Sequence, residues 1–288
     1  MGALILFVAA LFWGCAFVAQ KLGGDHLGPF AVTFSRNLAG GLFLLGVCAA
    51  RRRSGVFNRK AVVGGFAGGA ILFFASLTQQ IGIADTTPGI SAFLTSNYVL
   101  LVPVFGLFAG RKPTLLSFVW VAFALAGTYL LAIDNAQPGL TSIGRGEAWT
   151  LLCAVLFALQ ILAVDRFAPG TDIFAFSCVQ QFTGMIFAMP FLMLASERAH
   201  YNMADISAAV WPVLFIGIFS SGIAYTCQNI GQTRCPPMLA AVIMTLESAI
   251  GALAGYVILG DAFTPRQMAG AGIMFATAIL SQILEGGK

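Results

Sequence analysis

An acidic residue lies within a long apolar stretch near the C-terminal end of the chain. Glu247 falls near the middle of residues 238–259, whose other side chains are apolar, small or hydroxyl-bearing. A helix of this length spans roughly 33 Å, about the thickness of the hydrocarbon core of a bilayer, which places Glu247 close to the midplane. An ionisable group there costs roughly 2.5 kcal/mol or more, so Glu247 is a candidate for contact with a substrate amine or for carrying a coupling proton. The alternative is a protonated acid that bonds a neighbouring helix for packing alone.

A second ionisable side chain, Arg36, lies inside the apolar stretch 29–50, about two helical turns from its start. A guanidinium group can hold a carboxylate through two parallel hydrogen bonds, so Arg36 is a candidate for binding a substrate carboxylate. The alternative is a structural strut that bonds a cluster of carbonyl groups.

Polar and aromatic side chains at helical spacing in other apolar stretches predict a translocation path, because a path must replace the water around a polar substrate. Trp13, Phe17 and Gln20, for example, fall on one face of a helix over 2–21. The candidate path-lining residues are Trp13, Phe17, Gln20, Thr78, Gln79, Asn97, Tyr98, Gln160, Tyr225, Gln228 and Glu247. Core packing is the alternative role for the rings, and helix–helix hydrogen bonding is the alternative role for the amides.

The elements that position these residues must lie in a membrane. Of the 288 residues 59% are hydrophobic and 9% are charged, with a mean hydropathy of +0.90, whereas soluble domains are about 25% charged. Apolar runs bounded by Pro, Gly or charged residues predict an all-α membrane protein with ten transmembrane helices. The predicted spans are 2–21, 29–50, 61–82, 89–109, 114–133, 147–167, 171–195, 208–231, 238–259 and 266–284.

Basic residues gather in the connection that follows the second predicted span. They are Arg51, Arg52, Arg53, Arg59 and Lys60. The positive-inside rule places this connection in the cytoplasm, and with ten spans both termini share that side. We therefore interpret the cluster as membrane anchoring and expect no nucleic-acid partner. The expected partners are the lipid bilayer and a small-molecule substrate, with proton coupling and the oligomeric state left open.

Motifs for catalysis or nucleotide hydrolysis do not occur in the sequence. It contains no HExxH, GxSxG or GxxxxGK[ST] motif, which argues against an intramembrane enzyme and against a primary pump. The six cysteines show no CxxC or Cys/His spacing and resemble small core residues. We therefore expect no disulfide, no metal site and no cofactor.

The two halves of the sequence share motifs in the same order. Gln79, Ile81 and Gly82 recur as Gln228, Ile230 and Gly231, Thr95 recurs as Thr245, and Phe17 and Gln20 recur as Phe157 and Gln160. The repeat predicts two five-helix units, 1–135 and 145–285. Because five is an odd number, the second unit enters the membrane from the opposite side, which makes an inverted repeat. Such a repeat supports alternating access to a central cavity between the two units.

The order of several motifs resembles the EamA branch of the drug/metabolite transporter superfamily over essentially the whole chain. The motifs are Trp13-Gly14-x-x-Phe17-Val18-x-x-Lys21, Pro29 with Arg36, Leu246-Glu247, Leu259-Gly260-Asp261 and Gly270. The sequence departs from the family pattern at Ser248, where proline is usual, and at Asp261, where glutamate is usual. The resemblance implies export of small metabolites across a bacterial inner membrane.

Among relatives, the exporters of aromatic and other neutral amino acids are the most similar in appearance. We therefore expect a multi-pass secondary transporter of the bacterial inner membrane that exports such amino acids by alternating access. The alternatives are a facilitator channel and a broad drug or metabolite exporter for a substrate that is not an amino acid.

Overall fold

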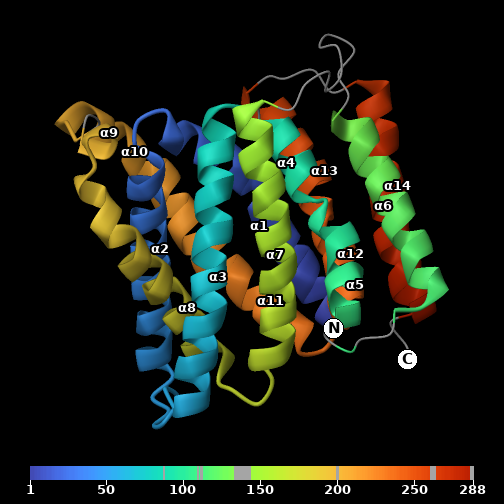
Figure 1. Ribbon diagram of the computed structural model, residues 1–288, viewed down its shortest axis with the longest axis horizontal. Helices are drawn as coiled ribbons and strands as arrows, with labels where there is room; N and C mark the ends of the chain where they lie inside the picture. Colours follow the sequence, from blue (N-terminus) through green and yellow to red (C-terminus); the bar gives the residue numbers. More distant parts are fainter. Residues whose placement is uncertain are drawn as a thin grey trace.

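The described part of the chain is a bundle of helices that run up and down side by side (Figure 1). A computed structural model describes residues 1–86, 88–108, 110, 113–132, 144–198, 201–259 and 264–285. Within these residues every regular element is a helix. Asp261, which carries part of the family resemblance, lies outside the described residues.

The first half of the chain supplies six helices. They are α1 (Gly2–Gly24), α2 (Pro29–Ala50), α3 (Arg59–Ala84), α4 (Pro88–Thr95), α5 (Tyr98–Phe108) and α6 (Leu115–Ala132). The start of α1 and the end of α14 lie at the same end of the bundle (Figure 1). We call this end the basic end, because the connection 51–58 between α2 and α3 lies there with Arg51, Arg52 and Arg53.

The second half supplies helices with more interruptions. They are α7 (Arg145–Phe167), α8 (Ile173–Ala188), the 3₁₀ turn η1 (Met189–Met193), α9 (Ala195–Arg198), α10 (Met203–Phe215), the π-helix η2 (Ile216–Ala224), α11 (Tyr225–Gln232), α12 (Pro237–Met244), α13 (Leu246–Ala254), the π-helix η3 (Gly255–Leu259) and α14 (Pro265–Glu285). Pro190 lies in η1, where the α-helical geometry of α8 has already ended, because proline cannot donate the next backbone hydrogen bond.

Eight helical segments of the described residues are long and apolar enough to cross a membrane. They are Gly2–Gly24, Pro29–Ala50, Arg59–Ala84, Pro88–Phe108, Arg145–Phe167, Ile173–Met193, Met203–Gln232 and Pro237–Ile258. The fifth and tenth predicted spans correspond to α6 and α14, which pack against each other. In α6 only a shorter apolar helix, Leu115–Leu130, is found, and α14 is not among the eight. An all-helical, multi-span protein is therefore confirmed, whereas the number ten stays a prediction.

The fourth and ninth predicted spans are each broken near their middle, which the sequence analysis did not predict. The break between α4 and α5 lies at Ser96 and Asn97, and the break between α12 and α13 lies at Thr245. The Ser96 and Ser248 hydroxyls are hydrogen-bonded to each other, and the Ser248 hydroxyl also lies within 3.0 Å of the Ala92 carbonyl oxygen. The two discontinuous helices therefore meet beside their breaks.

Helix α1 approaches α13 closely at a glycine. A Cβ atom on Gly14 would lie 2.6 Å from Ile250 Cβ and 2.8 Å from the carbonyl oxygen of Glu247. Any larger residue at position 14 would push the two helices apart. The glycine thus brings the Trp13 and Phe17 face of α1 next to the acidic residue.

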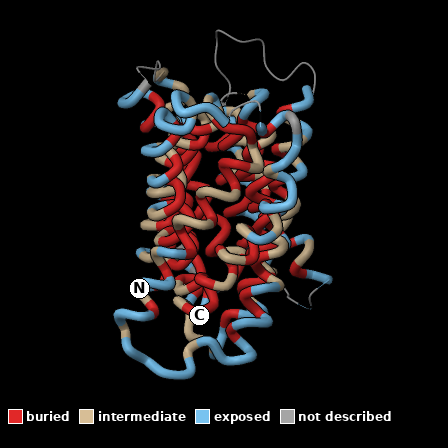
Figure 2. Tube along the Cα trace, turned by 90° about the vertical axis from the view of Figure 1, so that its left-hand side faces the viewer, coloured by how far each residue is buried: buried red, intermediate tan, exposed pale blue. Residues whose placement is uncertain are grey.

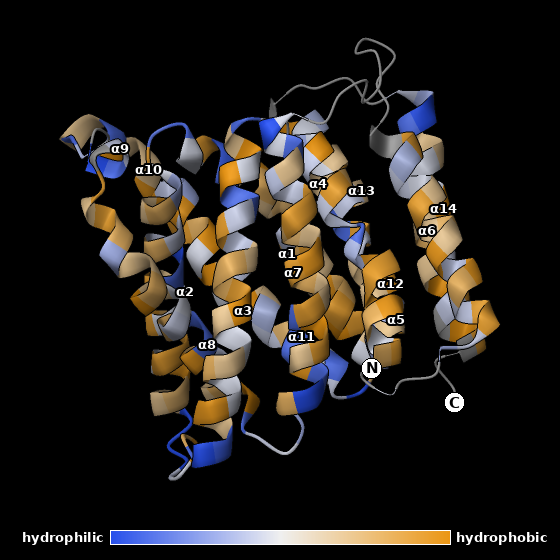
Figure 3. Ribbon diagram, viewed as in Figure 1, coloured by the Kyte–Doolittle hydropathy of each residue, from blue (hydrophilic) through white to orange (hydrophobic). Residues whose placement is uncertain are grey.

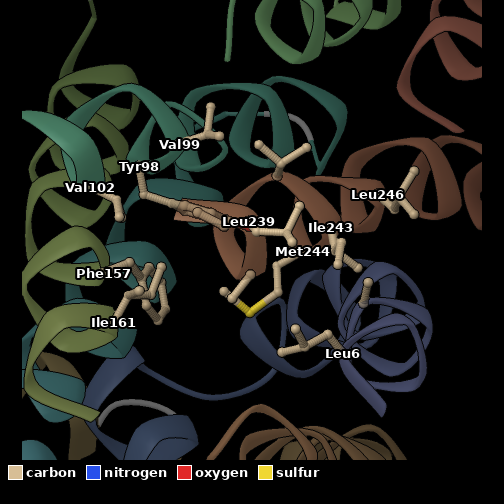
Figure 4. Close-up of a cluster of buried hydrophobic side chains, with 14 of the residues drawn as sticks. Leu6, Tyr98, Val99, Val102, Phe157, Ile161, Leu239, Ile243, Met244 and Leu246 are labelled. Carbon is tan, nitrogen blue, oxygen red and sulfur yellow. The ribbon is translucent and has the colours of Figure 1, made fainter. Parts of the chain in front are cut away.

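The apolar core packs around the broken helices. Figure 4 shows side chains from α1, α5, α7 and α12 converging there, among them Leu6, Tyr98, Phe157 and Met244. Buried residues run through the middle of the bundle, and exposed residues lie along its outside and at its ends (Figure 2). The helices are largely hydrophobic between the two ends of the bundle (Figure 3), and many of their large apolar side chains are exposed, as expected for helices in contact with lipid.

Candidate functional site

One cavity, which we call the central cavity, lies among α1, α2, α3, α4, α5, α7, η2, α11, α12 and α13. It is lined by Trp13, Phe17, Gln20, Arg36, Gln79, Thr95, Tyr98, Phe157, Ile161, Ser220, Tyr225, Gln228, Met244 and Glu247. The space open to the centre of a water molecule is about 30 Å³, and one water requires roughly 10–15 Å³ by that measure. The cavity therefore has room for only a few waters, and any larger molecule requires the lining side chains to move.

Glu247 lies in the first turn of α13 with its side chain at the central cavity. The residue is buried, with 5% of its surface exposed, and its Oε1 accepts a hydrogen bond of 3.2 Å from the Tyr98 hydroxyl. Thr245, directly before α13, keeps helical backbone angles, and its N–H group donates to the Ala241 carbonyl oxygen at 3.1 Å. The break beside Glu247 is therefore a local irregularity within one membrane-spanning helical segment, Pro237–Ile258.

Arg36 lies at the same cavity and is held by neutral groups. Its Nε donates to Ser221 Oγ at 2.9 Å, its Nη2 to Ser220 Oγ at 3.0 Å and its Nη1 to Gln20 Oε1 at 3.2 Å. The ion pairs recorded among the described residues do not include Arg36, which is only 2% exposed. A buried guanidinium without a compensating anion is costly, and here three neutral acceptors satisfy part of its hydrogen-bonding capacity. This geometry is compatible with both predicted roles, the structural strut and the substrate ligand.

The two serines reach Arg36 together because η2 is a π-helix. Ser220 and Ser221 are adjacent in sequence, and both are fully or almost fully buried. The wider turn of a π-helix changes the direction of successive side chains, and such turns are frequent at functional sites. Neither serine was predicted as a site residue, because hydroxyl groups in an apolar run carry no periodic signal.

Aromatic rings form part of the cavity wall. The rings of Trp13 and Tyr225 lie 5.0 Å apart between centroids at an angle of 58°. Phe17 and Phe157, which are repeat-related in sequence, are also buried at the cavity. These rings offer an apolar, polarisable surface to the non-polar part of a ligand.

The repeat-related glutamines Gln79 and Gln228 both reach the central cavity. The amide nitrogen of Gln79 donates to Thr95 Oγ1 at 3.2 Å, and that of Gln228 donates to Gln160 Oε1 at 3.0 Å. Each amide thus joins two different helices beside the cavity. Both predicted roles, path lining and helix–helix hydrogen bonding, are compatible with this geometry.

Three predicted residues do not line the cavity. Thr78 donates to carbonyl oxygens of its own helix, and Asn97 does the same at the break between α4 and α5. Gln160 lies behind Gln228, to which it is bonded. The sequence repeat, at an offset of 150 residues, pairs Asn97 with Glu247 and predicts that the two side chains face each other. In the structure the amide nitrogen of Asn97 bonds carbonyl oxygens of α4, and the Tyr98 hydroxyl bonds Glu247 instead.

A buried polar column along α11 was also absent from the sequence analysis. Asn229 donates to Ser177 Oγ at 2.8 Å and to Gln180 Oε1 at 2.7 Å, and Gln232 donates to the Ile161 carbonyl oxygen at 3.0 Å. With Tyr225 and Gln228 these residues follow the i, i+3, i+4, i+7 spacing of one helix face. The column therefore leads from the central cavity toward the basic end of the bundle.

Ionisable groups in the described residues do not form a metal-binding cluster. No group of three or more His, Cys, Asp and Glu side chains there is arranged to hold a metal ion, and the six cysteines are free thiols. The ligating and nucleophilic chemistry available to the central cavity is thus that of one carboxyl, one guanidinium, hydroxyl and amide groups.

Comparison with known proteins gives matches over nearly the whole chain. The model of the EamA-like transporter family matches residues 1–133 and 144–282. An uncharacterized transporter of Archaeoglobus fulgidus is 25% identical over 281 residues, covering 96% of this chain and 83% of that protein. The threonine/homoserine exporter RhtA of Escherichia coli K12 is 26% identical over 185 residues, covering 62% of this chain and 57% of the exporter. One crystal structure has a similar fold, with a TM-score of 0.80 at 21% identity over 98% of this chain and 96% of the other.

Proposed function

The chain belongs to the EamA-like transporter family, and from this membership we propose that it is a secondary transporter that exports small zwitterionic metabolites. The proposed substrates are aromatic and other neutral amino acids, and the proposed location is a bacterial inner membrane. The similarity to a protein named as a threonine/homoserine exporter supports this substrate class.

One observation carries the proposal: a guanidinium group and a carboxyl group both line the central cavity. Arg36 and Glu247 both line it, and both are almost completely buried. An α-amino acid carries a carboxylate and an ammonium group on one carbon, so it would satisfy both side chains at once. The net charge transferred into the membrane would then be small, because each buried charge gains a partner.

The rest of a substrate would contact the aromatic wall. Trp13, Phe17, Phe157 and Tyr225 lie at the cavity beside the two charged side chains. Rings bind both aliphatic and aromatic side chains through apolar contact, with an additional preference for other rings. The proposed site therefore favours neutral amino acids with apolar or aromatic side chains over acidic and basic ones.

The proposed mechanism is alternating access between two inverted five-helix units, 1–135 and 145–285, with both termini in the cytoplasm. Support comes from the breaks at Ser96 and Thr245, which interrupt the corresponding helices of the two sequence halves. In transporters with inverted repeats, discontinuous helices form the central substrate site. The small size of the cavity, which has room for only a few waters, supports a mechanism in which the lining helices move to admit a substrate.

Glu247 is the proposed site at which a substrate ammonium group and a proton exchange. The carboxyl group accepts a hydrogen bond from the Tyr98 hydroxyl. A substrate ammonium and a proton compete for the same carboxyl oxygens, so binding of one displaces the other. In the proposed mechanism this competition couples export of the substrate to an inward proton movement.

Flux in proteoliposomes tests the proposed function. The purified protein is reconstituted with internal phenylalanine or threonine, and uptake of the labelled amino acid is measured by counterflow. We expect counterflow, with at least tenfold weaker competition by 3-phenylpropionate, which lacks the amine, and by phenethylamine, which lacks the carboxylate. Competition by 3-phenylpropionate and phenethylamine as strong as that by unlabelled phenylalanine would overturn the zwitterion site. Flux without counterflow would favour a facilitator channel.

A further inference from the structure

An apolar groove lies on the outside of the bundle, away from the central cavity. It has a volume of about 450 Å³ and is lined by Leu45 of α2, Phe57 of the following connection, Val62, Val63 and Phe66 of α3, and Cys178, Val179, Phe182, Thr183 and Ile186 of α8. The volume falls within the range of roughly 300–1,000 Å³ that is typical of small-molecule sites. We call it the α2–α3–α8 groove.

Close helix packing creates the groove. Helix α8 packs against both α2 and α3. A Cβ atom on Gly65 would lie 2.8 Å from Val179 Cβ, so α3 approaches α8 as closely as a glycine permits. Leu45 and Val63 on the neighbouring helices remain 43% and 56% exposed. Helix α8 thus forms the floor of the groove, and α2 and α3 form its walls.

The groove runs along the membrane-spanning direction from the basic end. Its lining in α8 extends from Cys178 to Ile186, which corresponds to roughly 12 Å of helix. Phe57, in the connection 51–58, lines the groove at the end nearest the basic end of the bundle. The shape is therefore that of a narrow apolar slot that begins at the membrane surface and enters the hydrocarbon region.

Basic side chains stand at the surface end of this slot. Arg59 precedes Val62 and Val63 by three and four residues in α3, so it lies on the same helix face one turn closer to the surface. Arg52, Arg53 and Lys60 are exposed nearby in sequence. Figure 3 shows this connection as a hydrophilic segment directly below the hydrophobic surfaces of α2 and α3.

These cations differ from Arg51, which already has partners. Arg51 is bonded to Asp172 at 2.8 Å and lies 4.4 Å from the centre of the Phe174 ring. The ion pairs recorded for the described residues do not include Arg52, Arg53, Arg59 or Lys60. Arg59 and its neighbours are therefore available to an external anion.

We propose that the α2–α3–α8 groove is a binding site for an anionic phospholipid. One acyl chain occupies the apolar slot, and the phosphate group is held by Arg59 together with the exposed cations of the connection 51–58. Charge complementarity selects this occupant over neutral lipids, because basic residues at the ends of transmembrane helices attract anionic headgroups. A second copy of the chain in a symmetric contact would bring two identical basic clusters together, which like-charge repulsion disfavours.

Lipid retention in the purified full-length protein tests the proposal. Dioleoylphosphatidylglycerol and dioleoylphosphatidylcholine are titrated into delipidated protein in detergent, and bound lipid is counted by native mass spectrometry. The variants are Arg59→Gln, which removes the proposed phosphate contact, and Val63→Trp, which fills the slot at an exposed position. We expect the wild type to prefer the anionic lipid, Arg59→Gln to weaken its binding roughly fivefold, and Val63→Trp to abolish it.

Two matched variants separate a specific site from general attraction. Arg234→Gln removes one exposed positive charge at the same end of the bundle but outside the groove, and Val257→Trp adds a ring at an exposed position of η3. Both should bind the anionic lipid as the wild type does, and all variants should keep the unfolding temperature of the delipidated wild type.

Equal weakening by Arg59→Gln and Arg234→Gln would overturn the proposal in favour of general surface attraction. Unchanged binding in Val63→Trp would show that no acyl chain enters the slot. Displacement of the bound lipid by glycerol phosphate at the same concentration would contradict the acyl-chain contact and indicate a site for the headgroup only. A change of oligomeric mass in Val63→Trp without a change in bound lipid would indicate that the groove is an interface between copies of the chain. Because the assay requires no transport, its outcome is independent of the proposed function.

Discussion

The hydroxyl of Tyr98 donates a hydrogen bond of 3.2 Å to Oε1 of Glu247 and thereby joins the two discontinuous helical segments of the bundle. Tyr98 is the first residue of α5, directly after the break in the first half of the chain, and Glu247 is the second residue of α13, directly after the break in the second half. The carboxyl group in the central cavity is therefore positioned by the corresponding element of the opposite half.

Glu247→Gln should reduce counterflow of amino acids at neutral pH by at least tenfold and remove its pH dependence. The amide has almost the shape of the carboxyl group, but it cannot ionise, pair with an ammonium group or carry a proton. Loss of a buried charge-assisted hydrogen bond costs about 1.5–3 kcal/mol, which corresponds to this loss of affinity. Counterflow measured between pH 6 and pH 8 checks the prediction. Wild-type exchange with wild-type pH dependence would eliminate both proposed roles of Glu247.

Tyr98→Phe should raise the KM for amino acids roughly fivefold, while the Glu247 carboxyl group remains available to the substrate. The substitution removes only the hydroxyl that bonds Glu247, and a single hydrogen bond contributes about 0.5–1.5 kcal/mol. The effect should vanish when Tyr98→Phe is combined with Glu247→Gln, because the two side chains act as a pair. Additive effects in the double variant would show that Tyr98 acts on the substrate independently of Glu247.

Arg36→Lys should discriminate between a substrate ligand and a structural strut. A lysine keeps the charge but cannot reach Ser220, Ser221 and Gln20 together or hold a carboxylate with two parallel bonds. We expect the KM for phenylalanine to rise at least tenfold while weak inhibition by phenethylamine stays unchanged, because the amine lacks a carboxylate. A lower unfolding temperature with equal losses for both compounds would instead assign Arg36 a purely structural role.

Two charged residues of the central cavity were recognisable in the sequence because isolated charges in apolar spans are rare. Arg36 and Glu247 were identifiable from their type and position alone, and the rings of Trp13 and Phe17 from their helical spacing. Ile161 and Met244, in contrast, line the cavity as apolar residues in apolar spans, so nothing in their type distinguishes them from lipid-facing neighbours.

The breaks in the two central spans were not predictable from composition. Ser96 and Thr245 interrupt the helices in runs without proline or glycine at the break, so the strongest helix-breaking signals are missing there. Tertiary contacts, including the bond between Ser96 and Ser248, stabilise the interrupted form. The repeat register pairs Asn97 with Glu247, but Asn97 lies at the break itself, where its side chain bonds the carbonyl oxygens of Phe93 and Leu94.

Helices α2 and α8, which come from different halves of the chain, each have a first turn that is contacted by a residue following the other helix. Glu197, which follows α8, accepts hydrogen bonds from the N–H groups of Phe30 and Ala31 at the start of α2. Arg51, which follows α2, bonds Asp172 at the start of α8. Each contact lies at a different end of the bundle, and both satisfy or orient the unpaired N–H groups of a first helical turn.

The stability that Asp172 contributes should depend on pH. Partial burial alone would raise its pKa, but the hydrogen bond from Arg51 and those from the N–H groups of Ala175 and Phe174 hold the pKa of Asp172 below its ordinary value. The folded protein therefore binds this proton less readily than the unfolded chain does. The stabilisation is fully present above the unfolded pKa of about 3.9 and is lost as the pH falls through the lower folded value.

Asp172→Asn should consequently destabilise the protein by about 1 kcal/mol at pH 7 and by progressively less as the pH approaches 3. Asparagine can still cap the first turn of α8, so the loss reports the charge interaction with Arg51, whereas Asp172→Ala should lose about 1 kcal/mol more because the cap is also removed. Thermal unfolding of the detergent-solubilised protein between pH 3 and pH 7 measures the difference. Arg51→Gln should add little to Asp172→Asn, since both remove the same ion pair. An equal destabilisation by Asp172→Asn at both ends of the pH range would mean that the charge of Asp172 contributes nothing, and that its effect arises from the shape of the cap alone.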